Sequence, residues 1–285
     1  MRFSRLFLGL RFARPAEDRI VRFRKVLKAA QHVPRYRECL RRANLHSNRS
    51  IAALRCIEEA LAHFAVLDLD QFRGSREEYS SARAPIAPPQ RFFRPLERPS
   101  RIAVLMEGFE EKSGVRIFGR DSSDLYDSLR QYEPEVIAGP VSVLRRLVSS
   151  VDDGTLSLPL LRHAIVAFTG IDEVLDLHDR DVFWRTFQVP LFEHYAGLDG
   201  RVIARECEIH EGLHLVEEHA VIERHERQEL LLTSLTDFRQ PTLRLKTGYA
   251  GAIEKTLCEC GRVEPRVLAL TPLQRDSSRL TASAA

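Results

Sequence analysis

The stretch Val136-Ile137-Ala138-Gly139-Pro140 decides the fold class that this sequence predicts. Its three apolar residues are typical of a buried strand. Pro140 suits the first turn of a helix, where its missing N–H is not needed, so a helix is expected over 141–149. The next apolar run, Ala164-Ile165-Val166-Ala167-Phe168, indicates a second buried strand. Strand, helix and strand in this order form the repeating unit of a parallel sheet.

The same alternation extends outward from this unit in both directions. Further strands are expected over 102–105, 115–118 and 189–192, and further helices over 123–132 and 174–187. Strands that alternate with helices indicate an α/β fold with a mostly parallel sheet at its core.

The residues before this core predict helices and then a linker. Residues 17–66 carry apolar side chains at helical spacing, so three helices are expected there, the third over 50–65. Residues 74–100 have a linker composition, with three prolines between 85 and 89.

After residue 195 the pattern changes to short strands with turns between them, which predicts a small antiparallel β region. These strands are expected over 201–205, 213–216, 221–223, 229–233, 242–245 and 252–257. The chain is therefore expected to divide into a helical segment with its linker (1–100), an α/β subdomain (101–200), an antiparallel β subdomain (201–272) and a loose tail (273–285).

Composition excludes several classes of protein. The 285 residues are 44% hydrophobic, enough for a proper core, and 43 basic residues balance 40 acidic ones, which leaves no broad basic surface for nucleic acid. No apolar run is long enough for a transmembrane segment. Residues 1–15 are basic and apolar, a composition shared by transit peptides and surface anchors, and we favour instead a first helix packed on the body or a frayed end. Five cysteines are an odd number and do not suggest a disulfide framework, so a cytoplasmic protein is expected.

Three of the five cysteines lie in two short stretches, Ala204–His214 and Cys258–Arg262. His210-Glu211-Gly212 is expected to be a hairpin turn that makes His214 a cross-strand neighbour of Cys207. Three thiolates and one imidazole are a tetrahedral zinc set, which predicts a structural zinc site. The predicted ligands are Cys207, His214, Cys258 and Cys260, with His210 as the second choice for the histidine. Four protein ligands leave no position for a catalytic water. The alternative is a group of reduced thiols without a ligand.

Several stretches together, in this order and spacing, resemble the phenylacetate–CoA ligase-like family of adenylate-forming (AMP-binding) enzymes. The resemblance covers about residues 29–269. The stretches that carry it are Gln31–Arg37, Tyr132–Pro140, Phe168–Glu173, His194–Asp199, Ala204–His214, Phe238–Tyr249 and Cys258–Arg262.

The resemblance implies an activity and a set of site residues. The family activates a carboxylate with ATP to an acyl-adenylate and then forms a thioester with coenzyme A. Residues 168–173, with Gly170 and Glu173, stand where the family has a loop that faces the adenine. Tyr195, Ala196 and Asp199 stand in the family's Tyr-Gly-x-Thr-Glu motif, whose acid holds magnesium, so Asp199 is the one catalytic candidate. Tyr249 stands where the family has an acid that binds the ribose.

The chain also departs from the family's pattern, as a truncated and degenerate member would. The family's Gly/Ser/Thr-rich phosphate loop corresponds to residues 80–101, which contain no glycine. Backbone N–H groups can approach a phosphate closely where glycine is present. Leu198 replaces the threonine that contacts phosphate, and Tyr249 replaces the ribose-binding acid. The family's mobile C-terminal domain is expected to be absent.

Two functions are therefore weighed. The first is a non-catalytic relative that binds a carboxylic acid or a partner ligase. The second is an ATP-dependent carboxylate–CoA ligase whose site is completed in an oligomer, such as a homodimer, or by a second chain. ATP with magnesium and coenzyme A are cofactors only in the second case.

Overall fold

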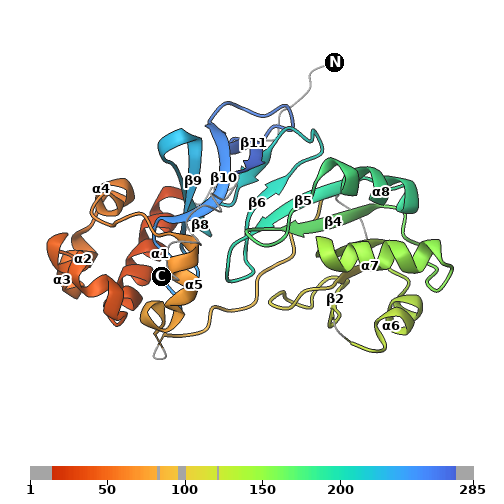
Figure 1. The fold of residues 1–285 in the computed structure, drawn as a ribbon, viewed down its shortest axis with the longest axis horizontal. Coiled ribbons are helices and arrows are strands. Elements are labelled where there is room, and N and C mark those ends of the chain that lie inside the picture. The colour runs from red at the N-terminus through yellow and green to blue at the C-terminus, as the bar shows by residue number, and fades with distance from the viewer. Residues whose placement is uncertain (1–14, 82–83, 96–100, 121, 274–285) are drawn as a thin grey trace, which may run out of the picture.

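The computed structural model describes residues 15–81, 84–95, 101–120 and 122–273. Figure 1 shows helices α1–α5 at one end of the molecule, α6–α8 with the parallel strands at the other end, and antiparallel strands between them. A single eleven-stranded sheet joins the parallel and antiparallel strands, in the order β2-β1-β3-β4-β5-β6-β7-β11-β10-β9-β8. The fold is thus mixed α/β with one large sheet.

The N-terminal helices pack around an apolar core that they share with residues of the β region such as Val221 and Leu245. The helical residues of this core include Phe23, Leu27, Ile51 and Leu61. Their bounds are α1 Pro15–Ala30, η1 Pro34–Tyr36, α2 Arg37–Arg42, α3 Asn48–Ala53, α4 Ile57–Leu61, α5 Leu69–Gly74 and η2 Arg76–Tyr79.

The prediction of one helix over 50–65 is wrong, because Leu54 takes extended angles and separates α3 from α4. On a straight helix at about 100° per residue, Ile51 and Ile57 would point about 120° apart. The break lets both side chains face the same core.

The predicted α/β alternation is confirmed over residues 102–196. The strands are β1 Ile102–Val104, β2 Val115–Ile117, β3 Val136–Pro140, β4 Ala164–Thr169 and β5 Leu191–Ala196, and each neighbouring pair is parallel. Helices α6 Leu125–Tyr132, α7 Val141–Asp152 and α8 Leu177–Phe187 pack on one face of these strands. Carboxyl ends of parallel strands meet at one edge, so the segments after β3, β4 and β5 lie together.

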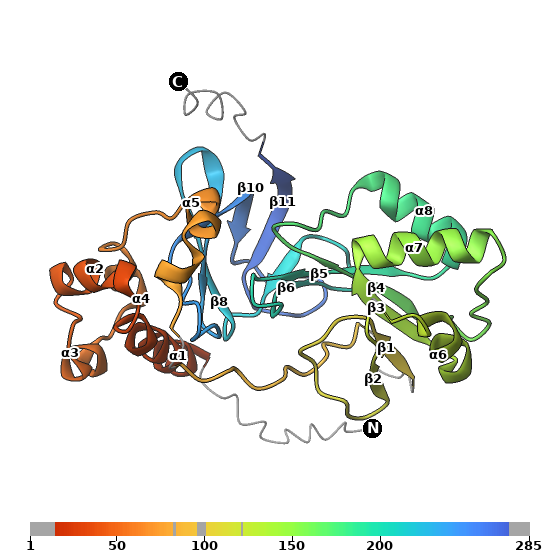
Figure 2. The same cartoon turned by 60° about the horizontal axis from the view of Figure 1, so that its bottom comes forward.

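The opposite face of these strands is covered by the linker (Figure 2). Phe92 from the linker packs with Phe109 and Phe168 over the sheet. Gln90 is buried, and its backbone exchanges hydrogen bonds with Gly108 and Glu110. The linker is therefore fixed to the rest of the fold at Gln90 and Phe92.

The antiparallel region is built from β6 Val202–Glu206, β7 Leu213–Leu215, β8 Ala220–Arg224, β9 Glu229–Ser234, β10 Leu245–Glu254 and β11 Arg266–Pro272, with η3 Glu226–Gln228 between β8 and β9. Two predictions are corrected here. In place of the strands expected over 242–245 and 252–257 there is one strand, β10, which leaves residues 242–244 and 255–257 outside it, and β11 was not predicted.

The shape of β10 explains the first error. Its pairing register with β11 shifts between Ala250 and Ala252, so the strand bends without ending. Gly251 lies at the bend, where an added Cβ would come within 3.0 Å of Val267. A glycine inside a strand marks such a close approach as often as it marks a turn.

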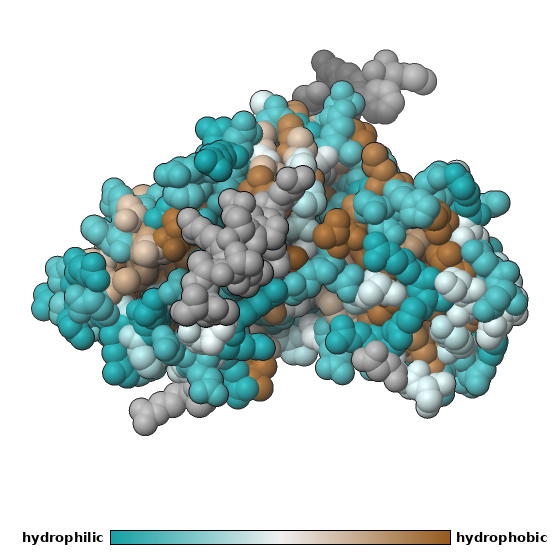
Figure 3. Space-filling view, viewed as in Figure 1, coloured by the Kyte–Doolittle hydropathy of each residue, from teal (hydrophilic) through white to brown (hydrophobic). Residues whose placement is uncertain are grey.

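The surface in Figure 3 is mostly hydrophilic, with hydrophobic residues in small patches. The exposed large hydrophobic residues include Leu177 and Trp184 on α8, and Leu257 and Val263 on either side of Cys258–Arg262. Among the described residues, no helix has the length and apolar character needed to span a membrane.

Candidate metal centre and neighbouring clefts

The hairpin of β6, β7 and the turn between them supplies two of the predicted metal ligands, Cys207 from the turn and His214 from β7. Cys207 follows the last residue of β6, and its carbonyl accepts a hydrogen bond from the His210 N–H at 3.0 Å. Gly212 has a φ of +79°, as the predicted turn requires, and a Cβ there would lie 2.5 Å from the Val267 carbonyl oxygen. The sequence therefore needs glycine at this position to bring the turn against β11.

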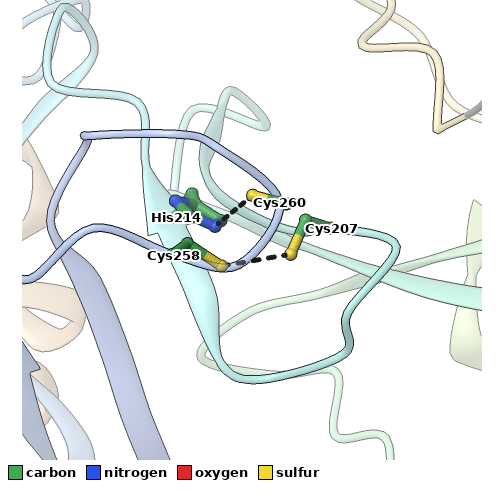
Figure 4. Close-up of side chains that lie close together, drawn as sticks. All are labelled: Cys207, His214, Cys258 and Cys260. Carbon is green, nitrogen blue, oxygen red and sulfur yellow. Dashed lines mark hydrogen bonds between the residues drawn. The ribbon is translucent and has the colours of Figure 1, made fainter.

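His214 lies in β7, but its cross-strand partner in β6 is Arg205 rather than Cys207. The prediction that His214 pairs with Cys207 was wrong in register. The side chains of the two residues are nevertheless close together. The turn curls beyond the end of β6 and carries Cys207 back toward the imidazole of His214 (Figure 4).

The other two ligands come from a knuckle between β10 and β11. The Gly261 N–H donates to the Cys258 carbonyl at 2.8 Å, and the Cys258 N–H donates to the Arg262 carbonyl at 3.1 Å. Gly261 has a φ of +83°, which reverses the chain directly after Cys260. This reversal directs both sulfurs to the same side, as the sequence predicts.

The four predicted ligand residues meet in the structure. The donor atoms of Cys207, His214, Cys258 and Cys260 lie within 4.8 Å of one another. The sulfurs of Cys207 and Cys258 are 3.9 Å apart, and the Cys260 sulfur is 3.4 Å from Nε2 of His214.

This donor set fits a tetrahedral zinc ion. An ion about 2.3 Å from each of two sulfurs would hold them about 3.8 Å apart. The second-choice ligand, His210, is outside the cluster: its ring stacks on Phe192, and its Nδ1 is 3.2 Å from Glu206. Burial raises the pKa of the Cys207 thiol to about 11, so this thiol is neutral at pH 7 unless a cation lies beside it.

Several residues that the resemblance assigns to nucleotide binding lie around a second candidate site, at the carboxyl ends of β3, β4 and β5. A hollow of about 190 Å³ is lined there by Gly170, Glu173, Ala196 and Leu198, among others. Glu173 does not project freely into it, because its carboxylate accepts hydrogen bonds from the Ser142 N–H at 3.1 Å and the Ser142 hydroxyl at 2.6 Å. Glu173 thus binds the start of α7, where a negative charge is favourable.

Tyr195 and Tyr249 meet behind this hollow. Their rings pack edge to face with centroids 5.8 Å apart, and the Tyr249 hydroxyl donates to the Gly170 carbonyl at 3.2 Å. The Tyr195 hydroxyl is buried and has no hydrogen-bond partner among the described residues. The structure thus brings Gly170, Tyr195, Ala196 and Tyr249 together, with Tyr249 serving as a structural contact.

Asp199 faces a different hollow, on the other side of the turn that follows β5. This cleft of about 360 Å³ is lined by the linker residues 85–90 and by Asp199, Arg201 and Thr236–Arg239. Asp199 accepts hydrogen bonds from the Thr236 hydroxyl at 2.7 Å and the Arg201 N–H at 3.2 Å. Burial and the nearby Asp199 raise the pKa of Asp237 to about 6.

The linker is bonded to the same turn through Gln90. The Gln90 side-chain amide donates to the Gly200 carbonyl at 2.8 Å and accepts from the Val202 N–H at 3.0 Å. Arg201 in turn donates to the Pro88 carbonyl. Peptide groups that border this cleft are therefore already paired with the linker.

Sequence reasoning missed Gln90, Asp237, Arg120 and Arg266. Gln90 meets Gly200 across 110 positions of sequence, and Arg120 lines the hollow beside Gly170 from the loop after β2. No local pattern marks such contacts, because they exist only once separate elements have packed.

The sequence matches no protein-family model and no curated protein. Its structure is similar to that of 2-hydroxyisobutyryl-CoA ligase. An open conformation of that ligase, in complex with 2-HIB-AMP and CoA, has a TM-score of 0.65 at 14% identity and covers 96% of this chain and 81% of its own. The ligase in its postadenylation state, with R3-HIB-AMP, has a TM-score of 0.66 at 12% identity and covers 95% and 73%.

This likeness shows that the chain has the fold of the adenylate-forming CoA ligases.

Proposed function

We propose that this chain is a non-catalytic protein of the adenylate-forming ligase fold that binds a carboxylic acid or a partner ligase. We further propose that its Cys₃His centre, formed by Cys207, His214, Cys258 and Cys260, holds a structural zinc ion. The finer resemblance, to the phenylacetate–CoA ligase-like branch of this fold, is part of the same proposal.

One observation carries the non-catalytic assignment: the segment at the position of the family's phosphate loop already forms hydrogen bonds with the rest of the protein. Residues 85–90 contain three prolines, which have no N–H to offer a phosphate, and no glycine. Gln90 and Pro88 are bonded to the turn that carries Asp199. A polyphosphate would have to displace these contacts.

Charge in the same cleft opposes a polyphosphate as well. Asp199 and Asp237 lie close enough for the charge of Asp199 to raise the pKa of Asp237. Two arginines, Arg201 and Arg239, also line the cleft, and Arg201 donates to the linker. Two carboxylates in a partly buried cleft repel an anion unless a metal ion lies between them.

The hollow beside Gly170 remains open and suits a small acid. Its apolar lining includes Met106 and Phe168, and Arg120 is the basic side chain that reaches it. Its two acids have partners in the protein: Asp172 accepts from Arg73 at 2.6 Å, and Glu173 accepts from Ser142. Because Arg120 lines the same hollow, a carboxylate bound here would lie near one basic residue.

Thermal unfolding with separate additions of ATP–Mg²⁺ and small acids tests the proposal. A nucleotide bound at micromolar strength would, at roughly 1 mM, add about 4 kcal/mol to the free energy of unfolding. We expect no rise in Tm with ATP–Mg²⁺ and a rise with 2-hydroxyisobutyrate or phenylacetate. Arg120→Met should abolish the acid effect, and Arg116→Met, on the neighbouring strand β2, should retain it.

A clear rise in Tm with ATP–Mg²⁺, or acid-dependent release of pyrophosphate, would remove the non-catalytic assignment. It would favour the alternative, a carboxylate–CoA ligase that uses ATP, magnesium and coenzyme A. A null result with every acid would leave the partner ligase as the ligand class, to be tested by co-purification with an active ligase of this fold.

A further inference from the structure

A buried arginine lies against the Cys₃His centre. Arg266 is the first residue of β11, and its cross-strand partner in β7 is the predicted ligand His214. Its side chain is only 7% exposed. An arginine is rarely buried unless its guanidinium has partners, so the groups around it indicate its role.

The guanidinium of Arg266 joins both halves of the centre. Nη1 lies 3.4 Å from the sulfur of Cys258 and 3.4 Å from the Glu211 carbonyl oxygen, in the turn between β6 and β7. Nη2 lies 3.1 Å from the Glu254 carboxylate and 3.4 Å from the Thr256 hydroxyl, at the start of the knuckle. One cation thus touches a ligand sulfur, the β6–β7 turn and the end of β10.

The charge of the centre explains why a cation belongs there. Three thiolates and a neutral imidazole around a divalent ion carry a net charge of minus one. Burying that charge without compensation is costly. Arginine stays protonated at any physiological pH, and its N–H groups stabilise a thiolate through charge-assisted hydrogen bonds. Arg262, the other basic residue of the knuckle, has Nη2 3.6 Å from Glu208, while its Nη1 is buried without a hydrogen-bond partner among the described residues.

We propose that Arg266 is a positioning residue of the metal centre: it neutralises the charge of the bound set and holds the Cys258 sulfur in place. This inference rests on the proposed zinc site. The competing explanation is that Arg266 only forms salt bridges, with Glu254 at 3.1 Å and with Glu211 at 3.6 Å, that join β10 and the β6–β7 turn to β11.

Zinc affinity, measured by chelator competition on the full chain, separates the two explanations. Loss of a group that supports metal ligands lowers affinity by roughly tenfold to a hundredfold, and we expect this for Arg266→Met. Arg266→Lys should weaken binding by only a few-fold, because it keeps the charge but has a single donor group. Glu254→Gln should change affinity by less than about threefold, because the sulfur contact remains.

Absorption of the cobalt-substituted protein gives a second readout that a mere salt bridge would not move. The thiolate-to-cobalt bands should shift in Arg266→Met and Arg266→Lys and stay unshifted in Glu254→Gln. Arg244→Met is the matched control: Arg244 is a similarly buried arginine of the β region, 3.3 Å from Glu223. It should lower stability with unchanged zinc affinity.

Wild-type affinity and an unshifted spectrum in Arg266→Met would overturn the proposal, as would an equal loss of affinity in Glu254→Gln. If Arg266→Met does not fold, an unshifted spectrum in Arg266→Lys overturns it instead. A wild-type chain that binds no zinc overturns the metal site and this inference together. The ATP experiment above is unaffected by any of these results, so failure of the non-catalytic assignment is detected separately.

Discussion

The metal centre and the Asp199 cleft lie in neighbouring parts of one sheet, and they differ in what their side chains are free to do. At the centre, four donor atoms converge within 4.8 Å, and they contact one another and the Arg266 guanidinium. In the cleft, Asp199, Gln90 and Arg201 are bonded to Thr236, Gly200 and Pro88. Side chains can bind an ion or a ligand together only where their polar atoms converge and are not already paired with the rest of the protein.

The largest expected effect on stability is that of losing the metal, and it tests the first of the two sites. Cys258→Ser removes one of four ligands, and because metal binding is part of the folding free energy, the 200–270 region should lose on the order of 5 kcal/mol of stability. Elemental analysis should find about one zinc per wild-type chain and almost none in the variant.

Cys39→Ser is the control for this experiment, because Cys39 packs against the helical core, far from the centre. It should keep the zinc of the wild type. Full zinc content in Cys258→Ser would contradict the ligand assignment.

A smaller effect tests the acidic cleft. The pKa of Asp237 is raised from 3.8 to about 6, so the folded state favours the neutral carboxyl. This contribution to stability is present at low pH and is lost as pH rises through about 6. Asp237→Asn keeps an acceptor for the Gln240 N–H and cannot ionise.

Denaturant unfolding should therefore show Asp237→Asn to be more stable than wild type by on the order of 2 kcal/mol at pH 7.5, with a much smaller difference at pH 4. Asp70→Asn, at an exposed position of α5, should show no such pH-dependent gain. A gain for Asp237→Asn that is equal at both pH values would show that the buried charge is not its cause.

The smallest effect compares the two tyrosines behind the Gly170 hollow. Tyr249→Phe removes a buried hydrogen bond to the Gly170 carbonyl and should cost about 1 kcal/mol. Tyr195→Phe removes a buried hydroxyl without a partner among the described residues, so it should be neutral or stabilising. Equal losses in the two variants, measured by thermal unfolding, would mean that the Tyr195 hydroxyl has a partner after all.

Local chemistry explains which features the sequence predicts well. The strand–helix alternation over 102–196 follows from runs of apolar residues such as Val136–Ala138, and it is present as expected. The four residues of the Cys₃His cluster were also predicted from the sequence, because three cysteines and a histidine beside two glycine turns form an uncommon pattern. Both features depend on residue types within a few positions of one another.

The tertiary structure decided what depends on contacts between distant segments. Packing shows that Gln90 bonds the linker to the turn beside the Asp199 cleft, that β10 is a single bent strand, and that β11 aligns Arg266 with His214 and Cys258. The physical reason is that hydrogen bonds and charges act over a few ångströms of space, whatever their separation in the chain. The sequence by itself therefore determined the fold class and the donor set, and only the folded chain determined which polar groups of the two sites are already paired with the protein.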